Sequence, residues 1–254
     1  MAMNTDCERG VDRLKQQQSD FLENVDHTLR TPLQSLMGFA GVLDPGLPAA
    51  DLEHGINSVK RNAAQLVDVW EDLWLRHQLK RGPLMLLPTR VDWEVLLVEQ
   101  LQSFESFFPG CLAEWEYFGE IPRVYTDPNR LQRILWTLLR NANGCRPDPQ
   151  QPGLLTMSVF YNPKTHRIGF RVASQGLQIP PGDLAGIFDE YTNVAGGQGL
   201  PRTGIGLGLY AARELARQMG GDLGVLSALA GSVQQYRHRF VLSLPAFEGQ
   251  ISYV

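Results

Sequence analysis

The sequence lacks the features that mark several classes of protein. Its three cysteines, Cys7, Cys111 and Cys145, lie far apart and form no Cys-x-x-Cys pair, so neither a disulfide framework nor a metal site is expected from them. No apolar run approaches the ~20 residues needed to span a bilayer, and the N-terminus has no signal-peptide core. These absences predict a cytoplasmic protein, or the cytoplasmic part of a longer one, with no membrane segment in this chain.

An excess of positive charge is also missing. The chain has 23 Lys and Arg residues against 27 Asp and Glu residues, which gives a net charge of −4 with neutral histidines. It therefore has no global basic field that would favour nucleic acid or an anionic membrane as a partner. With 254 residues, 43% of them hydrophobic and 20% charged, the chain can form one large or two ordinary globular domains.

A histidine followed by a proline lies within the first long helical pattern. The apolar residues keep alternating three- and four-residue steps on both sides of Pro32, at Leu22, Val25, Leu29, Leu36, Phe39 and Leu43. A proline inside a helix costs ~3 kcal/mol, yet the pattern resumes beyond it. His27 falls off this apolar seam, toward solvent, where a lone histidine is usually an ordinary surface residue.

A second helix is predicted after the turn sequence Asp-Pro-Gly-Leu-Pro at 44–48. It runs from about Ala49 to Arg81 and carries a heptad seam at Leu52, Ile56, Val59, Ala63, Leu66, Trp70 and Leu73. Two helices cannot bury two such seams between themselves, so we expect a second hairpin to complete a four-helix bundle, which makes the chain a homodimer. The alternative is an intramolecular hairpin that rests on the remaining chain.

Strands and helices alternate after the stop signal at Gly82-Pro83. We expect strands at 89–92, 113–118, 123–126, 154–161, 168–172, 223–226 and 239–244, and helices at 93–107, 127–144 and 209–219. This order predicts an α+β sandwich in which the helices cover one face of one sheet. The expected domains are residues 1–82 and 83–254.

Two stretches of the second domain have residues suited to phosphate and its counterion. Gly204, Gly206 and Gly208 alternate just before a helix, where glycine lets the backbone approach phosphate oxygens and the helix N-terminus presents unpaired N–H groups. Asn141, near the end of an earlier helix, can offer an amide oxygen to Mg²⁺, which prefers oxygen ligands. Each signal is weak alone, because glycine repeats and capping asparagines are common.

Five short motifs, in this order, resemble those of sensor histidine kinases and the GHKL ATPase superfamily. Residues 27–33 resemble the phosphoacceptor box, 127–142 the N-box, 174–181 the first glycine box, 187–191 the F-box and 204–209 the second glycine box. The resemblance implies a dimerisation and phosphoacceptor hairpin followed by an ATP-binding domain. It also implies autophosphorylation by ATP and phosphotransfer to an aspartate of a response-regulator receiver domain.

The resemblance assigns roles to individual residues. His27 would accept the phosphate, with Arg30 and Thr31 as further catalytic residues, and Thr31 would help to align water for dephosphorylating the regulator. The Gly-rich stretch at 196–199 would form a lid, steadied by the F-box. Mg²⁺ would be held by Asn141, and ATP by Asn141, Ser174, Gly176, Gly204, Gly206, Gly208 and Leu209.

Several residues that the resemblance would assign to ATP binding or catalysis are replaced in this chain. The aspartate expected to accept from the adenine amino group is Ser174, which exchanges a hydrogen bond worth roughly 1.5–3 kcal/mol for one worth ~1 kcal/mol. The acidic residue expected after the histidine is Thr28, and Asp26 lies about 200° around the helix from that position. The basic residue expected late in the N-box is Gly144, which leaves Arg146 as a candidate contact for phosphate.

Three functional hypotheses follow from these residues. The first is a slow histidine kinase, in which His27 is the nucleophile and Asn141 holds Mg²⁺. The second is a catalytically impaired relative that uses the same dimeric bundle to bind, dephosphorylate or sequester a regulator or another kinase. The third is a different GHKL ATPase of the gyrase or chaperone kind, which is disfavoured because those proteins lack the His-x-x-Arg-Thr-Pro hairpin.

Overall fold

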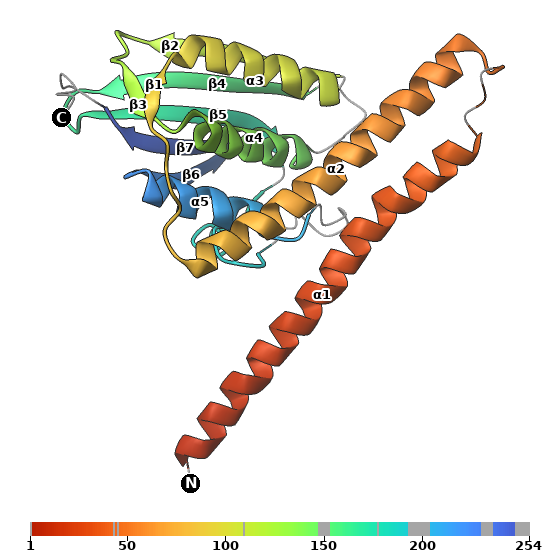
Figure 1. Cartoon of the computed structure of the whole chain (residues 1–254). Helices are drawn as coiled ribbons and strands as arrows, with labels where there is room; N and C mark the ends of the chain where they lie inside the picture. Colours follow the sequence, from red (N-terminus) through yellow and green to blue (C-terminus); the bar gives the residue numbers. More distant parts are fainter. Residues whose placement is uncertain are drawn as a thin grey trace.

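The computed structural model of the chain begins with a helical hairpin. Helix α1 runs from Ala2 to Val42, and α2 returns antiparallel to it from Ala49 to Arg81, while the N-terminal part of α1 extends away from the rest of the molecule (Figure 1). The side chains of α1 are described at Ser19 and from Phe21 onward. The structure describes residues 2–42, 44, 46–108, 110–146, 153–176, 178–192, 204–229 and 236–246.

Helix α1 continues through its internal proline, as the apolar spacing predicts. Pro32 is buried, and the hydroxyl of Thr31 donates to the carbonyl oxygen of His27 at 3.1 Å. Helix α2 has the predicted bounds. None of the helices in the described part of the chain is long and apolar enough to cross a membrane.

The predicted heptad seam of α2 is only partly covered within one chain. Ile56 is 40% exposed and Trp70 is 63% exposed. Instead, α2 buries Val69 and Leu75 on another face, together with the carboxylates of Asp68 and Asp72. This second face contacts the rest of the chain, so the hairpin does rest on the following domain, while Ile56 and Trp70 of the seam stay exposed.

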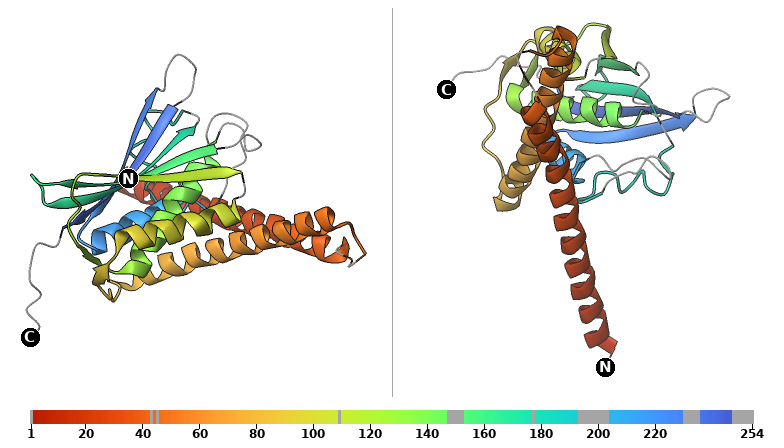
Figure 2. Two further views of the ribbon diagram at one scale, coloured as in Figure 1. Left: turned by 90° about the horizontal axis from the view of Figure 1, so that it is seen from above. Right: turned by 90° about the vertical axis from the view of Figure 1, so that its right-hand side faces the viewer.

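The remainder of the chain is an α+β sandwich, as expected. Among the described residues, five strands form one sheet in the order β2-β4-β5-β7-β6, in which β2 and β4 are parallel and the other neighbours antiparallel, and β1 pairs with β3 apart from it. Helices α3, α4 and α5 cover one face of the sheet (Figures 1 and 2). The elements are β1 (Thr89–Val91), α3 (Trp93–Phe107), β2 (Cys111–Phe118), β3 (Val124–Thr126), α4 (Pro128–Gly144), β4 (Gly153–Asn162), β5 (Arg167–Gly176), α5 (Gly208–Gln218), β6 (Asp222–Leu229) and β7 (Tyr236–Pro245).

The core lies between the sheet and the helices. Alternate residues of the central strands point inward, as their period of two requires, and meet one apolar face of α4. The largest fully buried side chains include Phe104, Phe170, Phe240, Leu131, Ile134, Leu135, Leu138 and Leu139. Helix α4 is therefore fixed at the centre of the domain, and so are the polar residues at its C-terminal end.

The N-terminus of α4 is capped as its sequence predicts. One carboxylate oxygen of Asp127 accepts from the Arg130 backbone N–H at 3.1 Å, and Pro128 occupies the first turn. The other oxygen of Asp127 accepts from the Leu87 N–H at 3.0 Å. The same buried side chain thus fixes the start of α4 and the segment that links α2 to the sheet.

Candidate functional site

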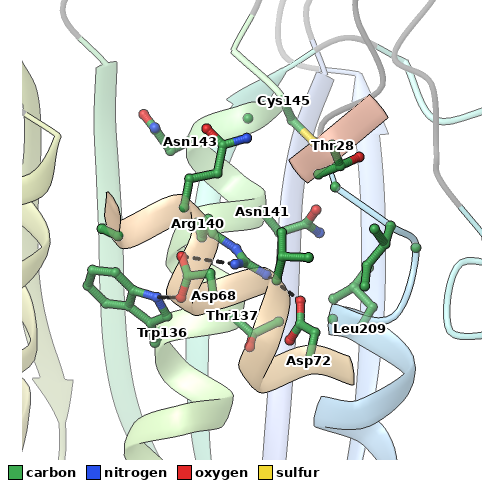
Figure 3. A pocket seen from close by; sticks show the side chains of 18 of the residues that line it. Thr28, Asp68, Asp72, Trp136, Thr137, Arg140, Asn141, Asn143, Cys145 and Leu209 are labelled. Atoms are coloured by element: carbon green, nitrogen blue, oxygen red, sulfur yellow. Dashed lines mark hydrogen bonds and ion pairs between the residues drawn. The ribbon is translucent and has the colours of Figure 1, made fainter. Parts of the chain in front are cut away.

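A cavity of about 430 Å³ lies between the hairpin and the α+β domain (Figure 3). Helix α4 contributes Thr137, Arg140 and Asn141 to its wall, and α2 contributes residues from Arg61 to Asp72. Other lining residues come from the segment after β5, from the loop before α5 and from the first residues of α5, among them Ile179, Ile187, Thr192, Gly204, Ile205, Gly206, Gly208 and Leu209. The predicted N-box and second glycine box therefore meet in one cavity.

The loop before α5 has the backbone geometry that its glycines predict. Gly204 and Gly206 have φ angles of +97° and +72°, in the region that favours glycine. A Cβ atom at position 206 would lie 2.7 Å from the backbone carbon of Tyr191. At position 208 it would lie 3.3 Å from Arg140 Nη2. These glycines keep the loop close to both the F-box and α4.

Ser174 and Gly176 are buried at the end of β5 and are not among the described residues that line the cavity. Ser174 is 4% exposed, and its Oγ has no hydrogen-bond partner in the described part of the structure. Its neighbour across the strands is His238 on β7. A Cβ atom on Gly176 would lie 2.8 Å from the Cys145 carbonyl oxygen, and Cys145 itself lines the cavity. The predicted adenine-binding residues thus lie next to the cavity wall.

The phosphoacceptor segment of α1 presents Thr28 to the cavity. Thr28 is 8% exposed and lines the cavity, whereas His27 is exposed and is not among the described lining residues (Figure 3). Arg30 forms an exposed ion pair with Asp26 at 2.7 Å, the kind of i,i+4 pair that contributes ~0.3–0.5 kcal/mol. Consecutive helix residues lie about 100° apart, so His27 faces away from the nearby cavity in this arrangement.

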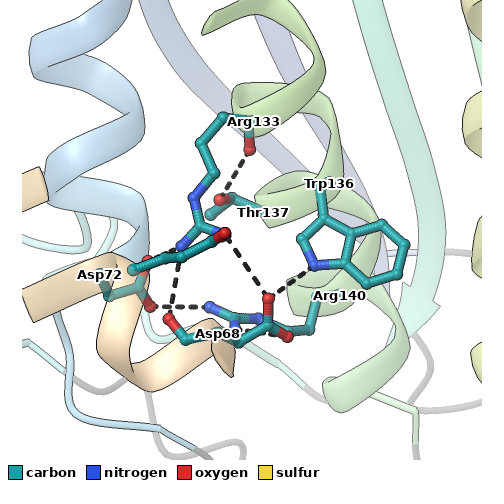
Figure 4. A network of polar contacts seen from close by, with 7 residues as sticks. Asp68, Asp72, Arg133, Trp136, Thr137 and Arg140 are labelled. Atoms are coloured by element: carbon teal, nitrogen blue, oxygen red, sulfur yellow. Dashed lines mark hydrogen bonds and ion pairs between the residues drawn. The ribbon is translucent and has the colours of Figure 1, made fainter. Parts of the chain in front are cut away.

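An ion-pair cluster joins α2 to α4 beside the cavity (Figure 4). Arg140 contacts Asp68 Oδ2 and Asp72 Oδ2, both at 2.9 Å. Arg133 contacts both of these carboxylates and Glu71 as well. The Trp136 indole N–H also donates to Asp68 Oδ1 at 2.9 Å. We call Asp68, Glu71, Asp72, Arg133 and Arg140 the α2–α4 cluster.

The charges in the α2–α4 cluster stabilise one another. Burial opposes the charge on Arg140, but the carboxylates of Asp72 and Asp68 outweigh that effect and raise the pKa of Arg140 above its ordinary value. Buried ion pairs of this kind contribute little net stability, whereas removing one partner is costly because it leaves an unpaired buried charge. The cluster therefore holds α2 against α4 in one defined register.

The loop before α5 together with the first residue of that helix, residues 204–208, is called the glycine loop below, and its apolar residues pack into the hairpin. Ile205 and Leu207, which alternate with the glycines, are 2% and 0% exposed. They form a cluster with Val69 of α2, against which Phe21, Val25, Leu29, Leu73 and Tyr191 also pack. The backbone of this loop thus borders the cavity while its side chains hold the hairpin.

The F-box is tied to both helices of the hairpin. Arg76 of α2 donates to Glu190 and to the Tyr191 hydroxyl, and Lys80 pairs with Glu190 at 2.9 Å. Burial opposes the charge of Glu190, but hydrogen bonds from Lys80 and Arg76 lower the pKa of that carboxyl below its usual value. The ring of Tyr191 contacts Phe21 of α1, with centroids 4.6 Å apart. The predicted lid at 196–199 lies outside the described residues.

Sequence reasoning missed the residues that join hairpin and domain. Asp68 and Asp72 look like solvent-facing positions in an amphipathic helix, and the only sequence signal for their burial is their four-residue spacing. No motif singles out Arg140 as a cation beside the glycine loop, and Arg146, the candidate that the sequence suggests, donates to the Asn143 carbonyl oxygen at 3.3 Å. Only tertiary structure brings Arg140 and Gly208 together.

Comparisons with known proteins agree with this architecture. The family described as histidine kinase-, DNA gyrase B- and HSP90-like ATPase matches residues 126–247. The aerobic respiration control sensor protein ArcB of Escherichia coli K12 is 30% identical over 221 residues, which are 85% of this chain and 28% of ArcB. The histidine protein kinase SaeS of Staphylococcus aureus USA300 is 27% identical over 222 residues, 84% of this chain and 61% of SaeS. The chain thus spans less than two thirds of either relative.

Solved structures show the same fold at low sequence identity. Full-length ShkA in complex with AMPPNP superposes with a TM-score of 0.58 at 24% identity, over 88% of this chain and 45% of that one. Histidine kinase ThkA in complex with response regulator protein TrrA gives 0.59 at 18% identity, over 96% of this chain and 66% of that one. Residues 126–247 thus match the histidine kinase-, DNA gyrase B- and HSP90-like ATPases, and the chain as a whole is similar in sequence and fold to the catalytic cores of sensor histidine kinases.

Proposed function

We propose that this chain phosphorylates His27 from ATP and passes the phosphate to an aspartate of a response-regulator receiver domain, at a reduced rate. The observation that carries the proposal is that Asn141, the glycine loop and the phosphoacceptor segment of α1 border one cavity. Residues 1–82 would supply the phosphoacceptor and dimer hairpin, and residues 83–254 the ATP-binding domain. Nucleic acid is not among the proposed partners, because the net charge of the chain is negative.

The residues around the cavity fit a nucleotide with its Mg²⁺. Asn143 Oδ1 and Ser174 Oγ are buried without a hydrogen-bond partner among the described residues, as expected where a ligand completes the site. Asn141 would hold Mg²⁺, which neutralises phosphate charge when bound. Gly204, Gly206, Gly208 and the backbone of Leu209 would approach the phosphates at the start of α5.

Phosphorylation of His27 requires a change from the present arrangement. An imidazole nitrogen of His27 must attack the γ-phosphorus of ATP while the bond to the ADP oxygen breaks and the ring loses its proton. Because Thr28 rather than His27 lines the cavity, α1 must rotate by about 100°, or His27 must enter the cavity of a second chain. Either route is open to a dimeric hairpin.

The function is tested by following phosphate from γ-labelled ATP and Mg²⁺ into the protein. Acid-labile, base-stable label on the unmodified chain is expected, because phosphohistidine has that stability, and His27→Gln should remove it completely. Asn141→Ala should reduce labelling by about tenfold or more through the lost Mg²⁺ ligand. Label that persists in His27→Gln would contradict His27 as the acceptor.

A homodimer is proposed because the hairpin leaves apolar side chains uncovered. Val67, Trp70 and Trp74 of α2 are 55%, 63% and 51% exposed, and Met37 of α1 is 76% exposed. The two tryptophan rings stack on each other with centroids 6.2 Å apart, which forms a continuous aromatic surface. Such a surface is larger than scattered exposed residues and is typical of an interface.

Trp70→Glu is expected to convert the dimer to a monomer, because it places an unpaired charge within the proposed bundle. The fold should survive, since Trp70 is 63% exposed in the single chain. Light scattering measures the mass, and Leu226→Glu, at a 64% exposed position of β6, is the matched control that should remain dimeric. A monomeric unmodified chain would refute the dimer.

Ser174→Asp is expected to tighten ATP binding by about tenfold or more, because a carboxylate forms a stronger hydrogen bond to an amino group than a hydroxyl does. Calorimetry with AMP-PNP and Mg²⁺ measures the affinity. Ser174→Asn introduces a side chain with nearly the shape of aspartate but without its charge, so the affinity for AMP-PNP should rise little. Equal affinities for Ser174→Asp and the unmodified chain would mean that adenine binds elsewhere.

Regulator dephosphorylation is the second candidate function, and the position of Thr31 favours it. Thr31 lies one turn beyond His27, is exposed, and its hydroxyl donates to the His27 carbonyl oxygen. This activity would need a docking face and a polar group, but neither of the two carboxylates that are replaced at Thr28 and Ser174. Loss of receiver-domain dephosphorylation in Thr31→Val would identify it.

A further inference from the structure

Arg140 lies beside the two elements that are proposed to hold Mg²⁺ and the phosphates of ATP. It immediately precedes Asn141 on α4 and lines the cavity. A Cβ atom on Gly208, at the N-terminus of α5, would lie 3.3 Å from Arg140 Nη2. The guanidinium group therefore lies close to the first residue of α5, beside the proposed Mg²⁺ ligand. A planar guanidinium can donate two parallel hydrogen bonds to a phosphate, which makes it a strong phosphate partner.

The present partners of Arg140 are protein carboxylates. Its Nη2 is 2.9 Å from Asp72 Oδ2, and its Nη1 is 2.9 Å from Asp68 Oδ2. Asp72 is 4% exposed, and its Oδ2 would lie 3.5 Å from the same hypothetical Cβ atom on Gly208. A carboxylate thus stands at the end of α5, where unpaired N–H groups and the helix dipole favour an anion.

An anion is therefore already present in the proposed phosphate subsite. A bound triphosphate would bring further negative charge close to Asp72, and like charges in a partly buried site repel strongly. A triphosphate bound there would therefore compete with the docked hairpin for the same guanidinium and the same helix end. A ligand can shift such an equilibrium only by binding one state better than the other.

We propose that Arg140 is the phosphate-contacting cation of this site, and that Asp72 and Asp68 hold it as internal anions until a polyphosphate displaces them. This inference rests on the proposed function, because it requires that the cavity bind ATP. Displacement removes two ion pairs of the α2–α4 cluster and so loosens α2 from α4. Nucleotide binding and hairpin docking then oppose each other through Arg140.

The affinity test uses full-length chain, AMP-PNP and Mg²⁺ in a calorimeter. Asp72→Asn is expected to tighten AMP-PNP binding by about tenfold or more, because it removes the competing charge. Arg140→Met is expected to weaken it by about tenfold or more. Glu71→Gln is the matched control: Glu71 is half exposed and pairs with Arg133 but not with Arg140, and an exposed pair of this kind contributes little to docking, so the AMP-PNP affinity of this variant should stay close to that of the unmodified chain. A merely structural ion pair would not change the AMP-PNP affinity in opposite directions in Asp72→Asn and Arg140→Met.

Folding of the variants is controlled separately. Arg140→Met leaves two carboxylates without one of their cations, so the double variant with Asp72→Asn serves as its partner, and both are checked by thermal melting. The gain in affinity should also depend on the number of phosphates. Asp72→Asn should tighten AMP-PNP more than ADP and leave AMP almost unchanged, because AMP carries no phosphate that reaches Arg140.

Movement of the cluster is observed through Trp136, whose indole N–H donates to Asp68 Oδ1 at 2.9 Å. The NMR signal of this indole N–H is assigned by its absence in Trp136→Phe. When AMP-PNP is added, the signal should move toward its position in Asp68→Asn, and the proton should exchange faster with solvent. AMP should cause neither change. An unmoved signal, or an equal affinity in Asp72→Asn and the unmodified chain, would overturn the inference while leaving ATP binding intact. If no variant binds AMP-PNP, both this inference and the proposed function fail.

Discussion

Autophosphorylation of His27 by the unmodified chain is expected to be about 10³-fold or more less efficient at low ATP than in a kinase that has both expected carboxylates. The deficit has two sources. Ser174 offers adenine only a neutral partner, which accounts for about tenfold in affinity. Thr28 supplies no carboxylate to orient and deprotonate the imidazole, a role worth roughly 10²–10⁴ in rate. The two factors multiply if they act independently.

Thr28→Glu is therefore expected to raise the rate of His27 labelling by about 10²-fold. The structure adds a condition to this prediction. Thr28 is buried against the cavity, so a glutamate there gains its role only once α1 turns His27 toward the nucleotide. Thr28→Gln has the same size without the charge and should give no gain. Rapid labelling of the unmodified chain at low micromolar ATP would show that another group acts as the base.

Leu207→Asp is expected to release the hairpin from the α+β domain while that domain stays folded. Leu207 is 0% exposed, and a carboxylate buried among Val69, Leu73 and Phe21 would cost several kcal/mol. Its apolar neighbours belong to a cluster separate from the main core, so the sheet does not depend on them. Small-angle scattering should show a larger radius of gyration.

The milder change Leu207→Ala should cost about 2–5 kcal/mol of docking energy and populate the open form partly. Leu226→Asp, at an exposed position, should leave the scattering curve unchanged. Circular dichroism distinguishes release from unfolding, because the sheet signal is retained only in the former. A Leu207 variant that loses the sheet signal at the same time as its hairpin is released would show that this cluster supports the whole fold.

Elements with strong local signals could be predicted from the sequence. The bounds of α2 and α3 match the predicted ranges, because each has an apolar period and a clear start and stop. Asp127-Pro128 likewise fixed the start of α4. Strand β5 extends to Gly176, beyond the predicted end, because pairing with β7 supplies partners that the local pattern does not show.

The relation between the two domains could not be predicted, since it depends on contacts far apart in sequence. Nothing local indicates that Asp72 meets Arg140, or that Thr28 rather than His27 borders the cavity. A polar residue in a helix is ordinarily solvated, and its burial becomes visible only when its partner's position is known. The motifs therefore identify the chemistry, whereas the tertiary structure determines which residues are ready to perform it.

The alternation of glycine with apolar residues at 204–208 has a thermodynamic consequence. The same short loop borders the proposed ATP site through its backbone and holds the hairpin through Ile205 and Leu207. Two equilibria that share one element are linked, and the linkage is reciprocal. If the docked and released forms differ in ATP affinity by some factor, saturating ATP must shift the docking equilibrium by that same factor. A stimulus that acts only on the hairpin would therefore change the affinity for the nucleotide without contacting the nucleotide.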